Sequence, residues 1–436
     1  METFLILFIG GTLIGLGLMG SRSRFRDWER AVTALRDWER AVTACGLQVL
    51  ETSSFVHSWL RASSGPLEVR IEQHGNPGAL LVVMGPGPPD FHSVSIRPQN
   101  MLRIGREIET GDERFDSKFF IEGPTQLVLA LLDQKVRSLL TGMEDESQVE
   151  IFYGEIRAVV AEDAKVHDVL VRLLEIHKRL APPLEIGQRL ADNITLDPEP
   201  GVRLRNLLLL IHERRHQPGT AEVLRKACAD PVPEIRLRAA RELGAEGRSV
   251  LLDLAEKQED DAASAVALSI VGGELPFERM NAILDLALSH RHLRSAHACL
   301  GMIGRHGAVA VDKLAQVLKS HYGELAPAAA EALGATASPD AESTLIQALQ
   351  RDEIELQVAA ANALGQVGST AAVPPLKEAG ERFDLGLRRS TRQAIAEIQS
   401  RAKGASPGQL SLADGQAGQL SLAHDPAGQL SLEGDD

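Results

Sequence analysis

The residues with the clearest capacity for chemistry are His212, Glu213 and His216, which form a His-Glu-x-x-His motif. On one continuous helix this spacing places both imidazoles where they can ligate zinc, and the glutamate beside a metal-bound water. Glu222 follows at the position of a third ligand. The motif raises the hypothesis of a zinc metallopeptidase that uses His212, Glu213, His216 and Glu222 as its site.

The surrounding sequence argues against this hypothesis. A proline and a glycine follow the motif closely and end a helix there. The segment that begins at Asp197 also aligns with the one that begins at Asp230 at a constant offset of 33 residues, so His212 matches Ala245, at the end of a repeat helix. We therefore predict a polar helix end without catalytic residues, metal or cofactor, and keep the metallopeptidase as the alternative.

The elements that carry the motif are predicted to be helices of a repeat. Ala/Leu-rich segments recur with a glycine at intervals of 28, 29, 33 and 31 residues, a period typical of α-solenoids. We expect each unit to be a helix, a left-handed glycine turn and a second helix, with neighbouring units stacked around a shared core. The glycines that mark the period are Gly244, Gly272, Gly301, Gly334 and Gly365.

Two segments, "DPVPEIRLRAARELGAEG" and "LQVAAANALGQVGSTAAVPPLKEA", resemble HEAT-like repeats of the phycobilisome-lyase type. The resemblance covers about residues 197–401 and implies a binding scaffold, and no separate pattern marks a bilin lyase. The predicted fold is mainly α: a HEAT-like α-solenoid at residues 181–401, C-terminal to a smaller α+β domain, with an N-terminal transmembrane helix.

The α+β domain is predicted at residues 46–180, where short strands alternate with amphipathic helices. Before it, residues 21–45 contain the sequence "RDWERAVTA" twice, ten residues apart, and form a juxtamembrane amphipathic helix in this prediction. Its apolar seam either packs on the next domain or forms a short coiled coil.

Both ends of the chain differ in composition from the rest. Residues 1–20 are apolar and four arginines follow them, which predicts a single-pass anchor in the cell inner membrane with the bulk of the chain in the cytoplasm. Residues 402–436 repeat Gly-Gln-Leu-Ser-Leu three times among small and acidic residues, which predicts a disordered acidic tail.

The charge distribution bears on partners. A net charge of −14 gives no electrostatic case for a nucleic-acid binder, and three widely spaced cysteines favour neither a disulfide framework nor a cysteine zinc site. We predict a non-catalytic, membrane-anchored scaffold or adaptor that binds another protein, whose identity the sequence does not give, through the repeat surface. The candidate binding ridge is basic and contains Arg203, Arg205, Arg225, Arg236 and Arg238.

Overall fold

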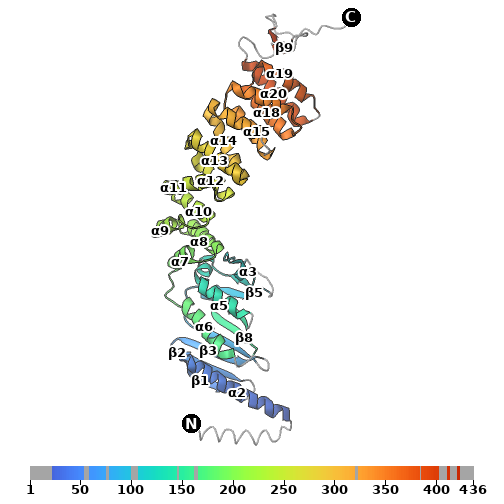
Figure 1. The fold of residues 1–436 in the computed structure, drawn as a ribbon. Helices are drawn as coiled ribbons and strands as arrows, with labels where there is room; N and C mark the ends of the chain where they lie inside the picture. The colour runs from blue at the N-terminus through green and yellow to red at the C-terminus, as the bar shows by residue number, and fades with distance from the viewer. Residues whose placement is uncertain are drawn as a thin grey trace. The chain divides into compact units, whose positions relative to one another are not determined.

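The computed structural model describes residues 22–53, 58–74, 78–99, 107–144, 147–161, 165–319, 323–382, 384–401, 410–412 and 420–422. The chain divides into two compact units, Met1–Ile235 and Arg236–Asp436. Figure 1 shows their helices and strands, coloured by residue number. The first unit combines a β-sheet with the first helices of the region that we predicted as solenoid, although the sequence suggested a domain boundary near residue 180.

The first unit contains an eight-stranded antiparallel sheet in the order β1-β2-β3-β4-β8-β7-β5-β6. Strands β2, β3, β7 and β8 alternate buried residues with more exposed ones, as expected for a sheet that is covered on one face. The open face carries ion pairs such as Arg61 with Glu68 and Arg157 with Glu150. The strands are β1 (Gln48–Ser53), β2 (Trp59–Ser64), β3 (Leu67–Gln73), β4 (Ala79–Met84), β5 (Ser95–Pro98), β6 (Phe119–Glu122), β7 (Ser147–Phe152) and β8 (Glu155–Val160).

Helices α2, α5 and α6 pack against the sheet and against one another. The seam of the duplicated helix is buried at Leu35, Trp38 and Val42, where α2 contacts β1, β2 and α6. The apolar seam of α2 thus packs on the neighbouring domain and does not form a coiled coil. The helices of this part are α2 (Arg22–Ala44), η1 (Phe91–Ser93), α3 (Glu113–Asp116), α4 (Thr125–Leu131), α5 (Gln134–Glu144) and α6 (Val166–Leu180).

Three further helices complete the first unit: α7 (Ile186–Leu196), α8 (Pro200–Glu213) and α9 (Thr220–Ala227). Helix α7 packs on α4, and its Asn193 side chain donates a 2.9 Å hydrogen bond to the carbonyl of Leu129. Arg189 of the same helix lies 2.7 Å from the carboxylate of Asp133. These contacts fix the first repeat helices on the sheet domain.

The second unit is helical, apart from two short strands near its end, and its helices form two layers. Consecutive members of one set, α12, α14, α16, α18 and α20, pack directly on each other, and we call this set the A layer. The helices that alternate with them, α11, α13, α15, α17 and α19, form the B layer. The A layer consists of α12 (Asp261–Val271), α14 (Leu293–Ile303), α16 (Ala326–Ala335), α18 (Ile354–Val367) and α20 (Leu385–Arg401). The B layer consists of α11 (Arg248–Lys257), α13 (Phe277–His290), α15 (Val311–Lys319), α17 (Glu342–Leu349) and α19 (Val373–Gly380).

Helix α10 (Pro233–Leu243) crosses the division between the two units. Short 3-10 turns connect or extend several helices of the second unit. They are η3 (Gly272–Glu274), η4 (Gly304–Ala310), η5 (Gly323–Leu325), η6 (Pro339–Ala341) and η7 (Thr370–Ala372).

The repeat glycines of the A layer serve helix packing, not left-handed turns. Gly272 and Gly304 have φ of −64° and −55°. A Cβ on Gly304 would lie 2.4 Å from the carbonyl oxygen of Ala332 on the next helix, and one on Gly334 would lie 2.8 Å from Ala363. A Cβ on Gly301 would meet nothing within 4 Å, so Gly301 is not the equivalent residue. Of the five predicted markers, Gly244 has a positive φ, of 59°.

The prediction of a transmembrane helix is corrected by the structure. In the described ranges no helix has the length and apolar character needed to cross a bilayer. The fold is therefore a helical C-terminal region with an N-terminal antiparallel sheet, and the single-pass inner-membrane location is likewise withdrawn. Residues 1–20, on which the prediction fell, lie outside the described residues.

The predicted disordered tail contains two short strands, β9 (Leu410–Leu412) and β10 (Leu420–Leu422). They pair antiparallel, with Ser411 opposite Ser421. Each strand is the Leu-Ser-Leu part of one Gly-Gln-Leu-Ser-Leu copy. The third copy, at residues 428–432, lies outside the described residues.

Candidate interaction surface

The His-Glu-x-x-His motif does not lie on one continuous helix. Helix α8 ends at Glu213, Arg214 forms its C-cap, and His216 follows in the turn. His212 and His216 are both exposed, and Glu213 accepts a hydrogen bond from Gln126. Without a shared helix the two imidazoles lack the arrangement that zinc ligation in such peptidases requires.

The predicted third ligand is engaged elsewhere. Glu222 lies on α9, within 3.6 Å of Arg225 and 3.7 Å of Lys226. Across the ranges that the structure describes, no three His, Cys, Asp or Glu side chains are grouped so that they could hold a metal ion.

The predicted basic ridge is not a single exposed surface. Arg203 is buried and binds both carboxylate oxygens of Asp230, at 2.7 and 3.0 Å. Arg205 and Arg225 are exposed, whereas Arg236 and Arg238 are half-buried and belong to the second unit. Arg236 also forms an ion pair with Glu259. Two of the five predicted ridge residues thus make contacts between repeats. Arg203 and Arg236 each bind an acidic residue that precedes the following repeat.

The same type of contact joins the sheet domain to the first repeat. Arg137 of α5 is buried and lies 3.0 Å from each carboxylate oxygen of Asp197 and 2.9 Å from Asp112. Burial alone would lower the pKa of Arg137, but its bonds to both carboxylates raise it. Asp197 is the repeat equivalent of Asp230, so Arg137 binds the first repeat as Arg203 binds the second. The sheet domain thus takes the place of a preceding repeat.

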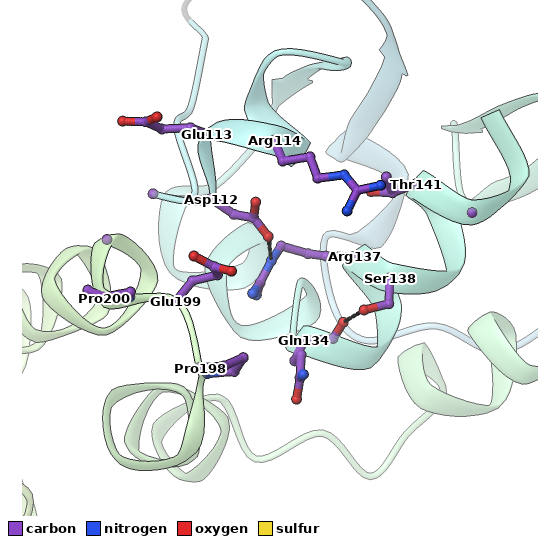
Figure 2. Close-up of a pocket in the computed structure, with 13 residues that line it drawn as sticks. Asp112, Glu113, Arg114, Gln134, Arg137, Ser138, Thr141, Pro198, Glu199 and Pro200 are labelled. Atoms are coloured by element: carbon purple, nitrogen blue, oxygen red, sulfur yellow. Dashed lines mark hydrogen bonds and ion pairs between the residues drawn. The ribbon is translucent and has the colours of Figure 1, made fainter. Parts of the chain in front are cut away.

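A polar pocket of about 670 Å³ lies at this joint, between α3, α5 and the start of α8 (Figure 2). Figure 2 shows Asp112 linked to Arg137, and Pro198 and Glu199 on the facing segment. The backbones of Gly111 and Gly201 touch at its wall, where a Cβ on Gly111 would lie 2.3 Å from the Gly201 oxygen. The charged groups at the base of the pocket already pair with one another, which indicates a structural joint.

Some charges of the second unit pair between repeats and others do not. In the B layer, charged side chains link neighbouring repeats: Arg279 pairs with Glu256, and Lys313 pairs with Asp285. On the exposed side of the A layer, which we call the A face, Arg294, Arg305, Glu331 and Glu355 are exposed. These four side chains form no ion pair or hydrogen bond with any residue that the structure describes. The A face therefore has charges that are available to another molecule.

The centre of the A face is formed by the exposed residues that precede the packing glycines. The residue three positions before each packing glycine is exposed, and in α14, α16 and α18 it is Gly301, Glu331 and Asn362. Small side chains surround these positions, because the close approach of the A-layer helices requires Ala and Gly. Sequence reasoning missed this face. The signal was available as residues 286–311, which contain no Asp or Glu but three Arg and four His.

Comparisons with known proteins agree with the repeat architecture of the second unit. A family model described as HEAT repeats matches residues 311–396. The match supports HEAT-like repeats in this part of the chain, while the phycobilisome-lyase type that we predicted is not shown. No curated protein matches the chain at a significant level.

Several solved structures show limited similarity. Two are engineered proteins: one has 18% identity and a TM-score of 0.34 over 63% of this chain and 83% of its own. The other has 20% identity and a TM-score of 0.23 over 50% and 90%. Human deoxyhypusine hydroxylase in complex with glycerol has 17% identity and a TM-score of 0.18 over 49% and 96%. At these TM-scores the similarity does not define a shared fold.

Proposed function

We propose that the chain is a non-catalytic repeat scaffold that binds another protein through the A face. The supporting observation is that Arg294, Arg305, Glu331 and Glu355 on the A face have no partner among the described residues, whereas two B-layer ion pairs, Arg279 with Glu256 and Lys313 with Asp285, link neighbouring repeats. Folding gains nothing from leaving exposed charges unpaired in fixed rows, but binding gains electrostatic complementarity from them.

The architecture is consistent with this role. Stacked helical repeats create extended surfaces, and HEAT repeats occupy residues 311–396. The sheet domain supports the array, because Arg137 holds the first repeat through Asp197. In this proposal the sheet domain and the B layer provide rigidity, and the A face provides recognition.

The proposal is tested with charge substitutions on each layer. The protein is purified from its native cells in complex with its partner, and the size of the complex is measured. Glu331→Arg with Asn362→Arg places two cations on the A face, and we expect it to release the partner. Gln316→Arg with Gln347→Arg places two cations at exposed B-layer positions and should retain the complex. Equal retention by both double variants would contradict the proposal.

A further inference from the structure

Helix α14 and the turn that follows it carry a basic stripe on the A face. The stripe consists of Arg294, His297, Gly301 and Arg305, which follow one another at steps of three and four residues and are all exposed. This spacing puts Arg294, His297 and Gly301 along one side of α14, and Arg305 follows them at the start of η4. Because residues 286–311 lack Asp and Glu, no acidic residue of this segment compensates the stripe.

One acidic group beside the stripe, Asp261, already binds backbone N–H groups. Asp261 of α12 accepts hydrogen bonds from the backbone N–H groups of Ser295, at 2.8 Å, and Arg294, at 3.1 Å. It thereby caps the start of α14. Burial alone would raise the pKa of Asp261, but these backbone bonds lower it. The guanidinium groups of Arg294 and Arg305 form no ion pair with a described residue, and the protein as a whole has a net charge of −14.

The neighbouring helices restrict what can bind to the stripe. On one side α16 exposes Glu331, and α18 beyond it exposes Glu355. A nucleic acid or other long polyanion that crossed the face would meet these carboxylates. On the other side α12 exposes Val266 and Ile270, at 36% and 43%, and no exposed charge accompanies them along the helix body. The stripe is therefore one helix wide, with an acidic border and an apolar border.

We infer that the α14 stripe binds a protein segment that presents a row of carboxylates to Arg294 and Arg305 and apolar side chains to Val266 and Ile270. An amphipathic helix with an acidic edge has this chemistry. Its diameter of about 10 Å also matches the spacing of adjacent helices, so it can lie along the stripe. The inference rests on the proposed function, because it specifies the partner of the A face.

The probe is a fluorescein-labelled peptide of about 20 residues, long enough to be helical, built from Ala and Leu with Glu along one edge. A matched peptide has Gln at every Glu position. Binding to the full chain is measured by fluorescence anisotropy. We expect the Glu peptide to bind at least about tenfold more tightly than the Gln peptide, with a preference that decreases as salt is raised.

Two double variants locate the effect. Arg294→Glu with Arg305→Glu should abolish the roughly tenfold preference, and the milder Arg294→Ser with Arg305→Ser should reduce it. Arg389→Glu with Arg392→Glu reverses two exposed arginines on α20 and should leave it unchanged. Circular dichroism checks that each variant is folded.

Several results would overturn the inference. Equal affinity for both peptides would do so, as would an equal loss of preference in the α20 variant. Tighter binding of a labelled oligouridylate through Arg294 and Arg305 would refute the protein partner. The complex with the native partner separates failure of this inference from failure of the proposed function. If the peptide results fail but the native complex is still lost in the Glu331→Arg, Asn362→Arg variant, the A face binds a partner of different chemistry.

Discussion

Gly301 and Gly304 lie three residues apart, at the end of α14 and the start of η4, yet their replacement by alanine should have opposite effects. A Cβ at Gly301 enters open space, whereas a Cβ at Gly304 would lie 2.4 Å from the carbonyl oxygen of Ala332. Gly301→Ala should stabilise the protein by about 0.5–1 kcal/mol, because alanine loses less backbone entropy in a helix. Gly304→Ala should destabilise it by about 1 kcal/mol or more, because overpacking against main chain costs about 1–3 kcal/mol.

The measurement is thermal unfolding of the full chain, followed by circular dichroism. A difference of about 2 kcal/mol between the two variants corresponds to roughly 4–8 °C in the melting temperature of a unit of this size. Wild-type protein should melt between the two variants. Equal melting temperatures would show that the A-layer helices do not meet at Gly304, and the repeat register based on Gly272, Gly304, Gly334 and Gly365 would be wrong.

Three further predictions concern stability. Arg203→Met should destabilise the protein by about 3–5 kcal/mol in urea unfolding, because the carboxylate of Asp230 stays buried without its partner, while the exposed Arg205→Ser should change it by less than about 0.5 kcal/mol. Leu364→Asp should cost at least about 4 kcal/mol, because Leu364 is fully buried in α18; melting like the wild type would refute its core position. Burial lowers the pKa of His177, whose Nε2 has no hydrogen-bond partner among the residues that the structure describes. The unfolded chain therefore takes up the proton first, and stability should fall as pH decreases below about 6.5; His177→Gln should reduce that slope, and an unchanged slope would assign it to other groups.

The helical repeat could be predicted from sequence because its period is long and regular, but the role of its glycines could not. A glycine in a right-handed helix and a glycine in a turn look alike in one sequence, and only the position of the facing helix separates Gly301 from Gly304. Replacing Gly301 by Gly304 as the repeat marker makes the spacing between the repeat glycines more even. The seam of α2 was predictable for a related reason, since Leu35, Trp38 and Val42 recur at helical spacing.

The candidate site was harder to predict, because exposure and pairing depend on tertiary contacts. Arg203 and Arg205 are two residues apart, yet one is buried against Asp230 and the other is exposed. Likewise, the spacing of His212 and His216 fits a metal helix only if the helix continues, and α8 ends between them. The A face emerges only when the helix layers are known, although the acid-free segment around α14 could have indicated it.

Site-specific photo-crosslinking in the cells that make the protein tests whether the A face binds a protein partner. A photoreactive residue is introduced at Asn362 on α18 or at Gln347 on α17, two exposed positions on opposite layers of adjacent helices. We expect Asn362 to crosslink to one discrete protein and Gln347 not to do so. Crosslinking to the same protein from Gln347 alone, or from neither position while the complex is intact, would contradict this expectation.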